Sequence, residues 1–202
     1  MSSSLRICCL DLEGVLLPEI WINVSRRTGV QALKLTTRDI PDYDRLMRYR
    51  LKILKKEGIR LRDIQKVIAS MKPLPGAKSF LKQLQQHCPV VILSDTFYEF
   101  AGPLMRQLED PTLLCHNLKV GKSGFITGYT LRQRDSKRRA VQALRQLNFR
   151  VVATGDSYND LSMLKAAHRG VLFNPPDAIR KKYPGFPVAR DYRALLKYLT
   201  TL

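Results

Sequence analysis

The sequence lacks any apolar run approaching the ~20 residues that a membrane-spanning helix needs, and its first apolar segment is too short for a secretory signal. It also has little cysteine. The four residues, Cys8, Cys9, Cys88 and Cys115, contain no CxxC pair and are too sparse for a disulfide scaffold. We therefore expect a soluble, cytoplasmic protein with reduced thiols and no membrane partner.

Acidic residues are scarce as well. Aspartate and glutamate number 17 against 35 lysines and arginines, so the formal net charge is +18. Such an excess suits nucleic acid, an anionic membrane surface or small phosphorylated substrates, and it does not choose among them. With 202 residues, of which 45% are hydrophobic, the chain fits one medium domain with room for a small insert.

Four short β-rich runs indicate the fold class. Each is almost continuously apolar rather than alternating, which is typical of parallel strands that are covered on both faces. The runs are Leu5–Leu10, Val90–Leu93, Val151–Thr154 and Val171–Phe173. Amphipathic helical patterns separate them at residues 76–87 and 137–148, and residues 113–135 indicate a hairpin. We predict an α/β fold, a doubly wound parallel sheet with right-handed crossovers.

The segment between the first two runs has a different character. Residues 18–72 are helical in pattern, with a helix expected to end at Gly58, and no convincing β-run interrupts them. The Pro and Gly residues of "KPLPGAKSF" mark the return to the sheet. We predict a core domain of residues 1–17 and 73–202, with residues 18–72 forming a small helical cap inserted after the first strand.

Polar residues follow three of the predicted strands. In an open α/β sheet, ligands bind outside the carboxyl ends of the strands, because the loops of neighbouring strands converge there. Asp11 and Glu13 follow the first run. Ser94, Asp95 and Thr96 follow the second, Asp156, Ser157, Asn159 and Asp160 follow the third, and Lys137 opens the helix before it.

Carboxylates that meet at one sheet edge repel each other unless a cation lies between them. Mg²⁺ suits this role, since it takes oxygen ligands and commonly bridges carboxylates to a substrate phosphate. The Ser94 hydroxyl, the backbone N–H groups of a turn and the Lys137 ammonium would then hold phosphate oxygens. This set of groups indicates phosphoryl transfer, with Asp11 as acceptor of the phosphoryl group and Glu13 as proton donor and acceptor.

These residues resemble four ordered motifs of the haloacid dehalogenase (HAD) superfamily of aspartyl-phosphate phosphotransferases. The motifs are "DLEGV" at residues 11–15, "LSDT" at residues 93–96, Lys137, and "GDSYND" at residues 155–160. "DLEGVLLPEIW", "TTRDIPDYD", "VVILSDTFYEF", "PLMRQL" and "PTLLCH" further resemble the bifunctional phosphoserine phosphatase/homoserine phosphotransferase branch. The resemblance covers the chain from Ile7 to about Tyr192.

The resemblance implies a Mg²⁺-dependent enzyme that transfers phosphate from O-phosphoserine to water or to homoserine. It also implies a role for each matching residue. Asp11 would be the nucleophile and a metal ligand, Glu13 a metal-contacting acid/base, Asp156 a metal ligand, Ser94, Asp95, Lys137 and Asn159 substrate or phosphate contacts, and Glu19 and Arg50 the cap residues that bind the amino and carboxylate ends of phosphoserine. Glu13 stands where the wider superfamily usually has Asp, and Asp95 adds an unusual anion near the substrate.

Glu19 and Arg50 also make sense without the resemblance. A zwitterionic amino acid needs an anion for its ammonium and a planar cation for its carboxylate. The alternatives are an ion pair between Glu19 and Arg50, a solvated basic face for Lys137, and helix caps or turns for the acids and the serine at the strand ends. His87, His116 and His168 are scattered without metal-ligand spacing, which favours structural or surface positions.

Two alternative functions remain. The chain could be a HAD phosphatase for another small phosphomonoester, or a non-catalytic, basic nucleic-acid-binding protein that uses the run "RQRDSKRRAVQALR". No helix-turn-helix, RNA-binding aromatic motif or zinc finger accompanies that run, which argues against a nucleic-acid partner. The sequence leaves open whether the chain forms a homodimer.

Overall fold

The computed structural model describes residues 5–37, 39–40 and 42–201. In this part of the chain one seven-stranded sheet forms, and only the pairing of β4 with β3 is antiparallel. The strands are β1 (Arg6–Leu10), β2 (Val90–Phe97), β3 (Leu113–Val120), β4 (Ile126–Thr130), β5 (Arg150–Gly155), β6 (Arg169–Phe173) and β7 (Val188–Ala189). The helices are α1 (Ile20–Thr28), η1 (Gln31–Lys34), α2 (Tyr43–Lys56), α3 (Leu61–Ala69), α4 (Ala77–Gln85), α5 (Tyr98–Gln107), α6 (Ser136–Gln146), η2 (Tyr158–Asp160), α7 (Leu161–Ala166), α8 (Asp177–Lys182) and α9 (Tyr192–Thr200).

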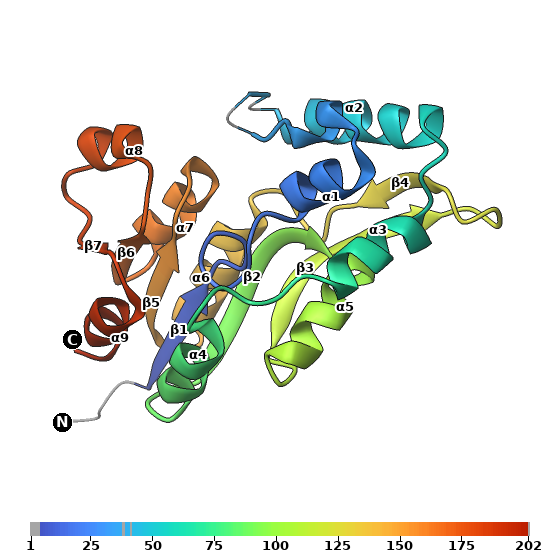
Figure 1. Cartoon of the computed structure of the whole chain (residues 1–202). Helices are drawn as coiled ribbons and strands as arrows, with labels where there is room; N and C mark the ends of the chain where they lie inside the picture. The colour runs from blue at the N-terminus through green and yellow to red at the C-terminus, as the bar shows by residue number, and fades with distance from the viewer. Residues whose placement is uncertain (1–4, 38, 41, 202) are drawn as a thin grey trace.

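The strand order explains where a site can form. It is β4-β3-β2-β1-β5-β6-β7, so the chain builds outward on one side of β1 and then returns to the other side (Figure 1). This reversal beside β1 is a topological switch point, at which loops diverge and leave a crevice at the carboxyl ends of the strands. The predicted doubly wound α/β fold is confirmed.

Burial on both faces of the sheet explains the continuous apolar runs. In β1, Cys8 and Leu10 belong to the core formed with α4, α5 and α9, whereas Ile7 and Cys9 belong to the core formed with α6 and α7. Neither face of the strand is left for polar residues. All four cysteines are free, as the sequence indicates, and all four are buried.

The segment of residues 18–72 contains α1, η1, α2 and α3, and no strand occurs among its described residues; Arg38 and Pro41 lie outside them. Helices α1 and α2 lie beyond the carboxyl ends of the central strands, and α3 lies beside α5 (Figure 1). Helix α2 ends at Lys56, and the expected glycine cap follows at Gly58, whose φ is 67°. The Ile59 N–H closes the turn on the Leu54 carbonyl at 2.9 Å. The division of the chain into core and cap stays a prediction.

Strand β2 departs from the prediction. It does not end at Leu93 but runs to Phe97, with a register shift against β3 between these two residues. Ser94 and Asp95 therefore lie inside an irregular strand instead of following it. Bulges of this kind are common next to active sites, because they redirect side chains. Among the described residues, no helix is both long and apolar enough to cross a membrane.

Candidate active site

A cavity of about 90 Å³ opens where the loops after β1 and β5 meet β2 and the helical segment. It gathers side chains from parts of the chain that are far apart in sequence. All nine residues predicted from the sequence line it: Asp11, Glu13, Glu19, Arg50, Ser94, Asp95, Lys137, Asp156 and Asn159. The structure thus brings the predicted set together in one cavity.

Lys137 is the cation at the centre of the site. Its Nζ lies 2.7 Å from Oδ1 of Asp11 and 2.8 Å from Oδ1 of Asp160, and all three side chains are buried. Burial alone would lower the pKa of Lys137, but the two carboxylates hold it well above its usual value, so the ammonium stays charged. The alternative that Lys137 belongs to a solvated basic face is therefore wrong.

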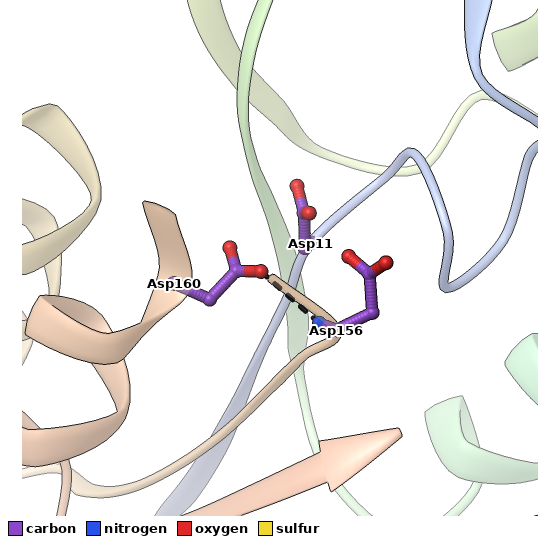
Figure 2. A group of neighbouring side chains, drawn as sticks. All are labelled: Asp11, Asp156 and Asp160. Atoms are coloured by element: carbon purple, nitrogen blue, oxygen red, sulfur yellow. Dashed lines mark hydrogen bonds between the residues drawn. The ribbon is translucent and has the colours of Figure 1, made fainter. Parts of the chain in front are cut away.

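Three aspartates converge beside this lysine. Carboxylate oxygens of Asp11, Asp156 and Asp160 all lie within 4.8 Å of one another, and Figure 2 shows the three side chains directed at a common region. Burial and the neighbouring Asp160 charge raise the pKa of Asp11, although Lys137 opposes this. Lys137 does not balance all three acids, and the residual negative charge suits a divalent cation.

Asp160 was given no site role in the sequence interpretation. Its Oδ2 accepts a hydrogen bond from the backbone N–H of Asp156 at 3.0 Å (Figure 2). The same oxygen accepts from the Ser157 backbone N–H at 3.0 Å and from the Ser157 hydroxyl at 2.9 Å. The cap interpretation is thus right for Asp160, which closes a capping box with Ser157. Because its Oδ1 accepts from Lys137, Asp160 fixes the ammonium and the Asp156 loop together.

Gly14 allows the loop after β1 to approach the loop after β5. Its φ is 80°, in the left-handed region that favours glycine. A Cβ atom at this position would lie 2.5 Å from Cγ of Asp156, which no side chain can tolerate without a shift. The glycine of "DLEG" is therefore required by the close packing of the two acidic loops.

Asp11 presents one oxygen to the cavity. Its Oδ1 accepts from the Leu12 N–H and from Lys137, both at 2.7 Å. Within the described residues, Oδ2 accepts no hydrogen bond. The side chain is thus fixed through one oxygen while the other is available to attack or to bind a cation. The alternative that Asp11 caps a helix is wrong, since the first helix in the described part of the chain begins at Ile20.

Glu13 is held apart from the three aspartates. Its Oε2 accepts the Ile20 N–H at the start of α1, at 2.8 Å. Burial and the nearby Glu19 raise the pKa of Glu13 to about 8, while that hydrogen bond and the charge of Arg50 oppose the rise. The protonated form is therefore present at neutral pH, so Glu13 can donate a proton there.

Arg50 is buried in the helical segment, with its guanidinium 4.4 Å from the centre of the Trp21 ring. One terminal nitrogen donates to the Leu35 carbonyl at 2.7 Å. Its Nε is buried and has no partner among the described residues. No ion pair forms between Arg50 and Glu19 in that part of the chain, so this alternative is wrong. Arg50 also lines the cavity, and its guanidinium is therefore a candidate contact for a ligand carboxylate.

Ser94 and Asn159 complete the lining. Ser94 is buried in β2, and its oxygen accepts the Thr96 N–H at 3.2 Å. Since both residues lie in the strand, the alternative that Ser94 caps a helix is wrong. Asn159 is exposed in η2, at the mouth of the cavity.

The chain is similar in sequence to known hydrolases. The model of the haloacid dehalogenase-like hydrolase family matches residues 5–168. The chain is 56% identical over 191 residues to phosphoserine phosphatase ThrH of Pseudomonas aeruginosa, covering 95% of this chain and 93% of the relative. It is 52% identical over 194 residues to a phosphoserine phosphatase of Pseudomonas syringae pv. tomato, covering 96% and 82%.

Solved structures agree on the fold. A phosphoserine phosphatase in apo form superposes with a TM-score of 0.78 at 21% identity, covering 96% of this chain and 98% of the other. A phospho-aspartyl intermediate analogue of phosphoserine phosphatase gives a TM-score of 0.78 at 20% identity, covering 97% and 99%. At these identities the likeness establishes the architecture alone.

Proposed function

The chain belongs to the haloacid dehalogenase-like hydrolase family, and on that premise we propose that it is a phosphoserine phosphatase that also transfers phosphate to homoserine. The observation that carries the proposal is the buried Asp11 carboxylate, fixed by Lys137 through one oxygen and open to the cavity through the other. Identity above half to two phosphoserine phosphatases supports the choice of substrate.

The acidic group fits Mg²⁺. Asp11 and Asp156 would hold the ion, because Asp160 already uses both of its oxygens for hydrogen bonds. When bound, the ion neutralises negative charge on the phosphoryl oxygens. The metal contact that the resemblance gives to Glu13 stays a prediction, since its carboxylate bonds to Ile20 here.

The reaction proceeds in two steps. Oδ2 of Asp11 attacks phosphorus, the bond from phosphorus to the serine oxygen breaks, and protonated Glu13 gives its proton to that oxygen. Water or the homoserine hydroxyl then attacks the aspartyl-phosphate and returns a proton to Glu13. The bond from phosphorus to Asp11 breaks, which regenerates the carboxylate. Lys137 and the Ser94 hydroxyl bind phosphoryl oxygens throughout.

We assign recognition of the amino acid to the helical segment. Residues 18–72 form a cap whose Glu19 and Arg50 bind the ammonium and carboxylate groups of phosphoserine. The unpaired Nε of Arg50 supports this role, because a carboxylate would satisfy it. Closure of the cap would exclude bulk water while the aspartyl-phosphate persists. Buried, reduced cysteines support a cytoplasmic location.

Replacement of Arg50 by lysine tests this recognition. Arg50→Lys keeps the charge but loses the planar fork, so we expect KM for phosphoserine to rise about tenfold or more. KM for p-nitrophenyl phosphate, which has no carboxylate, should change less than about threefold. The control is Arg48→Lys, on the exposed face of the same helix. Equal rises for both substrates would refute the carboxylate contact.

Product analysis tests the function itself. With phosphoserine and Mg²⁺ we expect inorganic phosphate, and with homoserine added we expect O-phosphohomoserine at the expense of phosphate. A rival is a phosphatase for another small phosphomonoester. It would be favoured by slow phosphoserine turnover together with fast turnover of a different phosphate ester. Nucleic-acid binding is not favoured, because Lys137, in the basic run, is buried between two carboxylates.

A further inference from the structure

A second cavity of about 200 Å³ adjoins the first. The two share five lining residues: Thr37, Tyr43, Asp95, Lys137 and Asn159. The second cavity adds His116 from β3, and Gln133, Asp135 and Ser136 from the segment that leads into α6. Glu19 and Arg50 line only the first cavity, so the second cavity borders Lys137 and Asp95 without contacting that pair.

Asp95 stands at the junction of the two cavities. Its Oδ1 lies 3.4 Å from the Ser136 hydroxyl, which donates to it, and 3.5 Å from Nε2 of His116. No hydrogen bond reaches Oδ2 from the residues that the structure describes. The side chain is about one-third exposed, at 32%. One oxygen thus fixes the carboxylate, and the other remains for a ligand.

His116 is oriented so that its Nε2 faces the Asp95 carboxylate. The Arg132 N–H donates to its Nδ1 at 3.1 Å, so neutral His116 carries its proton on Nε2, which faces Asp95. The imidazole is buried in β3 and packs edge-on against Tyr43, whose hydroxyl donates to the Asp95 carbonyl at 2.8 Å. Three elements of the fold therefore hold Asp95 in one position.

An anion at this position does not help to bind phosphate. The Asp95 carboxylate would repel phosphoryl oxygens, because both carry negative charge. A carboxylate with a free oxygen, beside a polar cavity, instead suits a cationic group that carries its own hydrogen-bond donors. Lys137, the Ser136 hydroxyl and His116 keep Asp95 ionised, since together they outweigh the effect of burial on its pKa. An ionised Asp95 is suited to binding an ammonium group and is a weak base.

We propose that the second cavity is an acceptor subsite, in which Oδ2 of Asp95 binds the ammonium group of an amino alcohol that receives the phosphoryl group. The proposal rests on the proposed function. The acceptor hydroxyl attacks phosphorus of the aspartyl-phosphate, the bond from phosphorus to Asp11 breaks, and the hydroxyl proton passes to Glu13. Asp95 takes no part in bond making, and it determines which acceptor competes with water.

The test compares two acceptors that differ in one group. Homoserine and γ-hydroxybutyrate share the hydroxyl and the carboxylate, and only homoserine has an ammonium. Acetyl phosphate serves as donor, so that the intermediate forms without phosphoserine. Background hydrolysis of the donor is subtracted by using Asp11→Asn. The readout is the ratio of phosphorylated acceptor to inorganic phosphate, which is independent of how fast the intermediate forms.

Asp95→Asn should lower the homoserine ratio about tenfold or more, while the γ-hydroxybutyrate ratio changes less than about twofold. The matched control is Asp177→Asn. This residue is exposed in α8, pairs with Arg180 and lines neither cavity. Its homoserine ratio should stay within about twofold of wild type.

Three outcomes would overturn the proposal: equal falls for both acceptors, an unchanged homoserine ratio in Asp95→Asn, or no phosphorylated homoserine from the wild-type enzyme. If the unchanged homoserine ratio is accompanied by a raised KM for phosphoserine, Asp95 contacts the donor instead. Failure of the proposed function is distinct, because it shows as absent phosphoserine turnover in an enzyme that acetyl phosphate still phosphorylates.

Discussion

Asp11→Asn is expected to abolish turnover of phosphoserine, with a loss of about 10⁴-fold or more, because the attacking oxygen is replaced by an amide nitrogen. The fold should survive the change. The Asn carbonyl can accept the two hydrogen bonds that Oδ1 now accepts, from the Leu12 N–H and Lys137. Neutralising one of three crowded carboxylates also relieves their repulsion. Steady-state phosphate release and thermal unfolding measure the two effects.

A second measurement separates loss of the nucleophile from loss of binding. Wild-type enzyme quenched in acid during turnover should carry a phosphoryl group that mass spectrometry locates on Asp11, and the variant should carry none. The control is Asp177→Asn, an exposed residue that pairs with Arg180 and that should keep activity within about twofold when changed. Near-normal turnover in Asp11→Asn would discard the aspartyl-phosphate mechanism.

The elements that the sequence predicts correctly are those in which burial produces a simple apolar pattern. Strand β1 is covered on both faces, so its apolar run is continuous and easy to recognise. The predicted strand ends at Leu93, because Ser94 and Asp95 are polar. In the structure both residues belong to β2, which continues through a register shift against β3. Helix α5 contains Pro103, which usually ends a helix, so its sequence gives little helical signal.

The candidate site follows the same logic. Glu19 and Arg50 were expected from the family resemblance. The residues after β1 and β5 could be predicted from the fold, because parallel strands end at one edge and these residues had to meet there. The supporting contacts could not. Asp160 contacts Lys137, which lies 23 residues earlier in the chain. Its position four residues after Asp156 is equally typical of a helix cap, so the spacing does not indicate this contact. His116 meets Asp95 only through the packing of β3 on an irregular β2.

Lys137→Met is expected to cost about 3–5 kcal/mol of the free energy of unfolding when metal is chelated, as well as activity. The ammonium is buried and lies 2.7 Å and 2.8 Å from Asp11 and Asp160. Without it, three neighbouring carboxylates remain in a buried pocket with their cation removed. Adding Mg²⁺ should recover part of the loss, since the ion restores positive charge beside Asp11 and Asp156. Urea unfolding with EDTA and with Mg²⁺ measures both.

Two control variants separate the effect of burying the lysine from the effect of its ion pair. Lys78 makes an ion pair of similar length, 3.0 Å to Glu109, but both side chains are more than half exposed. Lys78→Met should therefore cost less than about 1 kcal/mol. The double variant Lys137→Met/Asp160→Asn should be more stable than Lys137→Met alone, because one of the stranded charges is removed. If Lys137→Met in EDTA lies within about 1 kcal/mol of wild type, Lys137 is not what permits the acidic cluster to fold.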